Sequence, residues 1–213
     1  MSSRASAILF DLDGTLIDSI ELIRRSFRHM LASHGRDGSD DSIWRRGIGR
    51  PLEVQLAEIA RDERELSAMV KCYREYNYAH HDELVRAFPG VVDALDALRS
   101  RGARLGVVTS KARPGALRGL EHAGLARFVE VIVAAGDTAR PKPAGDPVTA
   151  ALAALGTAPE SAFTVGDALP DLAAGRAAGT RTAAVTWGAC DRATLETGGP
   201  DRVLVATSEL SSL

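Results

Sequence analysis

From residue 91 onward, short apolar runs alternate with segments of helical periodicity, and this alternation limits the possible folds more than any other feature of the chain. The apolar runs contain few polar interruptions, so each is expected to be a strand buried on both faces. Strands separated by helices form a parallel sheet with helices on both sides. We therefore predict an α/β protein with a doubly wound parallel sheet. Strands are expected at residues 104–108, 129–134, 162–165, 181–185 and 202–205, and helices at residues 91–101, 114–123, 147–155 and 169–178.

Another apolar run, residues 7–10, ends in two carboxylates, Asp11 and Asp13, which are followed by Gly14 and Thr15. Residues i and i+2 of an extended segment share a face, so both carboxylates can point into one site. Two acids held this close repel each other unless a cation or a shared proton compensates. A strand cap with solvated carboxylates is the alternative. The crowding favours a chemical role, because it is costly in a purely structural one.

Residues 18–86 have helical patterns and contain no clear strand. Helices are expected from residue 20 to about 31, and at residues 42–46, 52–60 and 62–82. We expect this block to be a helical cap inserted between the first strand and the rest of an α/β core, which then consists of residues 1–17 and 87–213. The two connections, near residues 17–18 and 86–88, are expected to act as hinges that let the cap open and close over the first strand's end.

Three further polar signals follow later strands. Thr109 ends the expected strand at 104–108, Lys142 lies between two prolines after the strand at 129–134, and Asp167 and Asp171 follow the strand at 162–165. Each signal alone has an ordinary explanation: a turn hydroxyl, a solvated lysine, or a pair of helix caps. However, ligand sites in parallel sheets lie beyond the carboxyl ends of the strands. Taken together, these residues predict one site at that edge.

The four signals in this order resemble the motifs of the haloacid dehalogenase superfamily, beginning with Asp-Leu-Asp-Gly-Thr-Leu at residues 11–16. The sequence is most similar to the phosphoglycolate-phosphatase-like branch with a small helical cap, and residues 88–91 and 186–188 also resemble that branch. Asp13 favours a phosphate ester over a halide or phosphonate substrate, since the relatives that act on those lack an aspartate there. Ala168 and Gly145 depart from the family pattern at positions without a proposed charge.

This resemblance implies a Mg²⁺-dependent phosphatase that works through an aspartyl-phosphate. Asp11 is then the nucleophile, and Asp13 protonates the leaving alcohol before it activates the hydrolytic water. Mg²⁺ is expected to bind Asp11, the backbone carbonyl of Asp13, and Asp167. Asp171 is expected to orient metal-bound water without touching the ion.

The same resemblance assigns substrate contacts. Thr109 and the backbone around Ser110 are expected to donate hydrogen bonds to the phosphoryl oxygens, and Lys142 to offset the charge of both Asp11 and the phosphoryl group. Arg46 and Arg50 lie beside a loop that resembles the family's specificity loop, where an arginine could reach a second anionic group. A solvated basic turn is the alternative for these arginines.

The expected substrate is a small phosphate ester such as phosphoglycolate, while sugar phosphates, nucleotides, pyrophosphate and a secondary-metabolite phosphate stay open. A sugar-phosphate mutase of the same superfamily and a non-catalytic phosphate-binding or regulatory relative are the alternative functions. The formal net charge of -2 gives no reason to expect nucleic acid or an anionic membrane as a partner. We expect a cytoplasmic protein without a signal peptide or membrane span, acting as a monomer or weak homodimer.

The remaining candidates for chemistry have plainer interpretations. Cys72 and Cys190 lie far apart in the sequence and are expected to be inert thiols. Trp44 and Trp187 are expected to be packing residues. The histidines show no metal-binding spacing, and all are expected on helix surfaces: His29, His34, His80, His81 and His122.

Overall fold

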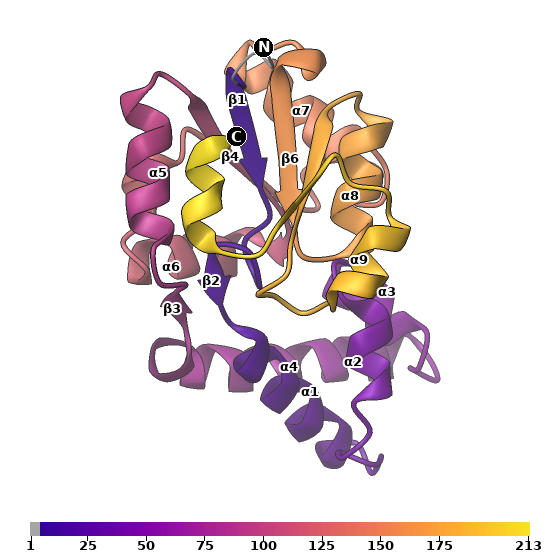
Figure 1. The fold of residues 1–213 in the computed structure, drawn as a ribbon. Coiled ribbons are helices and arrows are strands. Elements are labelled where there is room, and N and C mark those ends of the chain that lie inside the picture. The colour runs from indigo at the N-terminus through magenta and orange to yellow at the C-terminus, as the bar shows by residue number, and fades with distance from the viewer. Residues whose placement is uncertain (1–4) are drawn as a thin grey trace.

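A computed structural model describes residues 5–213 and confirms the α/β fold (Figure 1). Six parallel strands form one sheet in the order β5-β4-β1-β6-β7-β8, so β1 and β6 lie side by side at its centre. The strands are β1 (Ala7–Phe10), β4 (Arg104–Ala112), β5 (Val131–Ala135), β6 (Ala162–Gly166), β7 (Arg181–Val185) and β8 (Arg202–Leu204). This central pair places the end of the first strand next to the end of β6.

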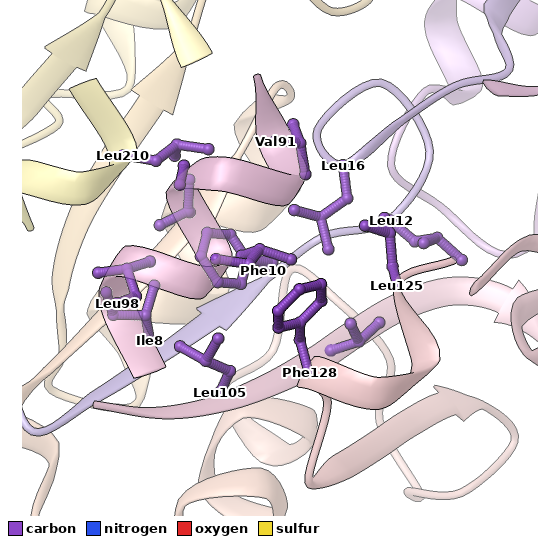
Figure 2. Packing of buried hydrophobic residues seen from close by; sticks show 14 of the residues in the cluster. Ile8, Phe10, Leu12, Leu16, Val91, Leu98, Leu105, Leu125, Phe128 and Leu210 are labelled. Atoms are coloured by element: carbon purple, nitrogen blue, oxygen red, sulfur yellow. The ribbon is translucent and has the colours of Figure 1, made fainter. Parts of the chain in front are cut away.

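Helices cover both faces of the sheet, as the alternating pattern predicts. One face packs on α5 (Val91–Ser100), α6 (Arg113–His122) and the C-terminal 3₁₀ helix η3 (Thr207–Ser212), and the other packs on α7 (Asp146–Leu155) and α8 (Leu169–Ala177). Successive side chains of β1 point to opposite faces because a strand has a side-chain period of two. Ile8 and Phe10 accordingly join the first cluster, shown in Figure 2 with Leu98 and Leu210, and Leu9 joins the second.

Residues between β1 and α5 form the predicted helical block. Its helices are α1 (Ile20–Ser33), α2 (Ser42–Gly47), α3 (Leu52–Ala57) and α4 (Glu63–Leu84), and they gather at the end of the sheet toward which β1 and β6 point (Figure 1). Their buried apolar side chains form a cluster of their own, which includes Phe27, Met30 and Trp44. The predicted cap therefore lies over the carboxyl ends of the strands.

The two connections to this block are paired with each other. Strand β2 (Ile17–Asp18) and strand β3 (Arg86–Ala87) form a two-stranded antiparallel sheet in which Ile17 lies opposite Ala87. No local pattern predicted this pairing, because two-residue strands are too short to show one. Both connections consequently run side by side where the cap meets the core.

Most predicted elements differ from the structure only at their ends. Two C-terminal elements were not predicted: α9 (Arg192–Thr197) and η3, which are both too short to have a clear period. Two shorter 3₁₀ helices, η1 (Ala126–Phe128) and η2 (Pro159–Ser161), precede β5 and β6. Within residues 5–213, none of the helices has the length and apolar character that crossing a membrane requires.

Candidate active site

Asp11 and Asp13 leave the end of β1 in a tight turn. The N–H of Asp11 still donates to the carbonyl oxygen of Val165 in β6 at 2.8 Å, so the ladder between the two strands continues to the site itself. Gly14 then adopts φ +81°, a conformation that glycine tolerates and other residues avoid. A Cβ atom at Gly14 would lie 2.2 Å from Oδ2 of Asp167. The glycine is thus required both for the turn and for the approach of Asp167.

Lys142 connects three of the strand ends through its ammonium group. Its Nζ donates to Oδ1 of Asp11 at 2.8 Å, to Oδ1 of Asp171 at 2.5 Å and to the carbonyl oxygen of Val108 at 3.0 Å. An ammonium has three donors, and these three acceptors use all of them. The Lys142 side chain is only 2% exposed. Although burial disfavours the charged form, the carboxylates of Asp11 and Asp171 outweigh it and raise the pKa of Lys142.

Asp167 is held from the opposite side of the site. Its Oδ1 accepts a hydrogen bond from the hydroxyl of Thr15 at 3.2 Å, and its Oδ2 accepts one from the N–H of Ala189 at 2.7 Å. A Cβ atom on Gly188 would lie 2.4 Å from Oδ2 of Asp167, so the loop after β7 packs closely on this carboxylate. Trp187, the residue before Gly188, donates its indole N–H to the carbonyl oxygen of Thr15 at 3.1 Å.

The site holds more negative than positive charge. Burial raises the pKa of Asp11 to about 7, with Lys142 opposing the shift, and burial and the charge of Asp11 raise the pKa of Asp167. Oxygen atoms of Asp11, Asp167 and Asp171 all lie within 4.8 Å of one another. Buried carboxylates at this spacing favour a cation, and Mg²⁺ prefers oxygen ligands. These residues therefore fit the predicted Mg²⁺ site. Both carboxylate oxygens of Asp171 accept hydrogen bonds from the protein, one from Nζ of Lys142 and the other from the N–H of Ala168 at 3.1 Å.

Asp13 faces a different set of partners. Its Oδ1 accepts hydrogen bonds from the hydroxyl of Ser19 at 2.6 Å and from Nζ of Lys111 at 2.8 Å, and its Oδ2 accepts from the same Nζ at 3.0 Å. Its side chain lines a cavity with a volume of about 130 Å³ that lies between the core and the helical cap. The predicted role of Asp13 as an acid for the leaving group is compatible with this position and stays a prediction.

Thr109 and Ser110 lie at the end of β4, also on the cavity wall. The hydroxyl oxygen of Thr109 accepts from the N–H of Lys111 at 3.1 Å. The hydroxyl of Ser110 donates to the carbonyl oxygen of Gly49 in the cap at 2.7 Å. The Ser110 side chain thus joins core to cap, while its backbone remains available for the predicted phosphoryl contact.

The structure separates the two arginines predicted for the cap. Arg50 lines the cavity and also forms an ion pair with Glu58. Arg46 is exposed and is not among the residues that line the cavity, so its predicted substrate contact stays a prediction. The cause of this exposure is the phase of α2: Trp44 is buried, and a residue two positions later in a helix points to nearly the opposite side.

One histidine differs from the sequence prediction. His81 was expected on a helix surface, but its side chain is fully buried where α4 meets α6. Its Nδ1 lies 2.7 Å from Oδ1 of Asp82, a carboxylate that also binds Arg118 of α6 at 3.0 Å. Burial lowers the pKa of His81. His81 and Asp82 therefore help to join the cap to the core.

Four residues of the site were not predicted to act there: Thr15, Ser19, Lys111 and Ala189. Thr15 belongs to the first motif, Lys111 follows Ser110 directly and Ala189 follows residues 186–188 directly, so all three were adjacent to recognised signals. The contact of Ser19 had no sequence signal, because it depends on how the cap packs on the core.

Comparisons with known proteins agree with this site. Residues 8–185 match the model of the haloacid dehalogenase-like hydrolase family. The chain is 40% identical over 209 residues to pyrophosphatase PpaX of Bacillus velezensis, which covers 97% of this chain and 95% of the relative. It is 39% identical over 207 residues to pyrophosphatase PpaX of Bacillus cereus, again covering 97% and 95%.

A solved structure shows the same fold over the full chain. The haloacid dehalogenase-like hydrolase from Streptococcus pneumoniae superposes with a TM-score of 0.85 and 30% identity, covering 100% of this chain and 99% of that one. The chain belongs to the haloacid dehalogenase-like hydrolase family. The prediction of an enzyme of the phosphatase type within this superfamily is confirmed.

Proposed function

We propose that this protein is a Mg²⁺-dependent phosphatase that hydrolyses a small phosphorylated compound through an aspartyl-phosphate on Asp11. The observation that carries the proposal is the buried cluster in which Lys142 contacts both Asp11 and Asp171 while Asp167 lies beside them. Three strand ends supply these residues, and all of them face the cavity end of the sheet. Such a cluster of opposed charges is unfavourable without a function, because burying charged groups is costly.

Asp11 is suited to be the nucleophile, because Lys142 holds Oδ1 of its carboxylate, while no side chain or N–H within residues 5–213 donates a hydrogen bond to its Oδ2. The ammonium fixes the carboxylate and lowers its repulsion toward an incoming phosphoryl dianion. Thr109 lies on the same cavity wall and can donate its hydroxyl proton to a phosphoryl oxygen, since its oxygen already accepts from Lys111. These groups would orient the phosphoryl group for attack.

Mg²⁺ would be held by Asp11, the backbone carbonyl of Asp13 and Asp167, with Asp171 positioned by Lys142 behind them. When bound, the ion supplies positive charge that offsets the dianionic phosphoryl group. Asp13, two residues after the nucleophile, lies on the cavity wall. We propose that it gives a proton to the leaving oxygen and later takes one from the attacking water.

Residues 18–86 act in this proposal as a cap that closes the site. They supply much of the cavity wall, including Trp44, Arg50 and Tyr73. The small cavity favours a compact substrate. Pyrophosphate is the first candidate, because relatives about 40% identical over nearly the whole chain are named pyrophosphatases. Phosphoglycolate is the second compact candidate to be compared with it.

The test is hydrolysis of a phosphate panel that includes pyrophosphate, phosphoglycolate and a hexose phosphate, with Mg²⁺ or with EDTA. We expect Mg²⁺-dependent release of phosphate, and loss of that activity by about 10³-fold or more in Asp11→Asn. Asp96→Asn serves as the matched control, because Asp96 is an exposed residue of α5 outside the cavity.

Three outcomes would contradict the proposal. Asp11→Asn that keeps most of the activity would exclude Asp11 as the nucleophile. Isomerisation of the hexose phosphate without net phosphate release would favour a mutase. No Mg²⁺-dependent turnover on any member of the panel would favour a non-catalytic phosphate-binding relative.

A further inference from the structure

Lys111 places a positive charge on the cavity wall at the point where the leaving group is expected. Its Nζ lies 2.8 Å from Oδ1 and 3.0 Å from Oδ2 of Asp13, and its side chain is 13% exposed. Lys111 also lines the cavity. Its ammonium is therefore within one hydrogen-bond length of the carboxylate that faces the leaving oxygen.

Two other cations line the same cavity, but their carboxylate partners differ in kind. Arg50 pairs with Glu58 and Arg74 pairs with Glu53, and all four of these residues belong to the cap. Lys111 comes from the core and pairs with Asp13, a residue of the proposed chemistry. Of these three cations, Lys111 is thus the one that contacts a residue of the proposed chemistry.

The backbone around Lys111 fixes where its charge can reach. The N–H of Lys111 donates to the hydroxyl oxygen of Thr109, the residue proposed to contact the phosphoryl group. The Lys111 stem packs over the start of α6, because a Cβ atom on Gly115 would lie 3.1 Å from its Cε. The end of β4 thus places Thr109 toward the proposed phosphoryl site and Lys111 toward the group attached to it.

We propose that Lys111 is a specificity-determining residue that binds an anionic oxygen of the leaving group beside the scissile bond. This inference rests on the proposed function, since it uses Asp13 to locate the leaving oxygen. It selects compact leaving groups that carry a charge next to the scissile bond, such as the second phosphate of pyrophosphate. An uncharged leaving group such as glycerol offers the ammonium no anionic partner, and charge-assisted hydrogen bonds are the stronger kind.

The experiment compares pyrophosphate with glycerol 2-phosphate in the wild type, Lys111→Met and Lys111→Arg, all with Mg²⁺. The wild type should prefer pyrophosphate. In Lys111→Met the ratio of the two kcat/KM values should fall about 30-fold toward glycerol 2-phosphate, the size expected when one hydrogen bond to a charged group is lost. Lys111→Arg keeps the charge and should keep most of the preference.

A binding measurement accompanies the kinetics and requires no turnover. Calorimetric titration should show that Lys111→Met weakens binding of methylenediphosphonate far more than binding of methylphosphonate, which lacks the second anionic group. If Lys111→Met does not fold, Lys111→Gln replaces it, because glutamine keeps a polar side chain without the charge.

Two results would overturn the inference: no change in either kcat/KM value, or an equal fall for both substrates and both ligands, which would make Lys111 a general support for the site. A wild type that hydrolyses neither of these substrates nor any member of the phosphate panel would instead refute the proposed function. In that case the two phosphonates still decide whether Lys111 recognises the second anionic group.

Discussion

The core side and the cap side of the cavity hold their charges in different ways. On the core side, the Lys142 and Asp171 side chains are 2% and 1% exposed, and Lys142 uses all three of its donors on fixed partners. On the cap side, the ion pair between Arg50 and Glu58 has side chains that are 28% and 57% exposed. Exposed pairs contribute little stability and rearrange easily, whereas buried pairs are costly to break.

This difference indicates that the deeply buried groups and the more exposed groups have different roles. The chemistry depends on groups that the sheet fixes before any substrate arrives, which is what electrostatic preorganisation requires. Substrate choice depends on less deeply buried groups, which can change partners: Arg50 of the cap and Lys111 of the core. If these roles are correct, substitutions of the fully buried groups should lower activity on every substrate, and substitutions of Arg50 and Lys111 should change the preference among substrates.

The largest effect is expected for Lys142→Met. Asp11 and Asp171 lose their shared cation, so kcat should fall about 10³-fold on every substrate. The metal-free protein should also lose about 3 kcal/mol of stability, because charged groups are left unpaired in the interior. Steady-state kinetics and thermal unfolding measure the two effects.

Lys71→Met is the matched control for this variant, since the Lys71 side chain is 76% exposed on α4. It should change neither quantity appreciably. Substantial activity in Lys142→Met would contradict the proposed contrast between the core side and the cap side, because the core site would then tolerate the loss of its central charge.

A second prediction concerns the pH dependence of stability without Mg²⁺. The pKa of Asp11 is raised from 3.8 to about 7, and that of Asp167 is raised in the same direction. The folded protein therefore keeps protons that the unfolded chain releases as the pH rises from about 4 to about 7. Stability in EDTA should therefore fall across this range. The fall is at most about 1.4 kcal/mol for each pH unit by which folding raises the pKa of a carboxyl group.

Mg²⁺ should reverse this trend, since it binds the ionised carboxylates and stabilises only the folded form. Thermal unfolding between pH 5 and pH 8 is the measurement, and the gain from Mg²⁺ should be larger at pH 8. In Asp11→Asn the decline in EDTA should be smaller. An equal decline with and without Mg²⁺ would show that these carboxylates do not form the metal site.

The contrast between the two sides also explains what the sequence could predict. Asp11, Lys142 and Asp167 each follow an apolar strand, and parallel strands bring such positions together at one edge of the sheet, so topology was sufficient to group them. The contact of Ser110 with Gly49 and the burial of His81 were not predictable in this way. They depend on how the cap packs on the core, which no local pattern records.

The exposed position of Arg46 was not predictable for a related reason. Helix α2 has six residues, less than two full turns, so its pattern does not define which side faces the core. Trp44 could be expected to pack inward, but the flanking arginines had no independent signal of direction. Short cap helices are therefore where sequence reasoning about substrate contacts is weakest.

The smallest expected effect tests which of the two cap arginines contacts the substrate. Arg50→Ala removes a cation that lines the cavity, so kcat/KM for an anionic substrate should fall about tenfold through a higher KM, with kcat nearly unchanged. Arg46→Ala is the matched control. Arg46 lies four residues before Arg50, but it is exposed and is not among the residues that line the cavity. This variant should change kcat/KM less than twofold. Equal effects of both variants would mean that the cap reorients α2 when substrate binds, and a fall in kcat for Arg50→Ala would place part of the chemistry on the cap side.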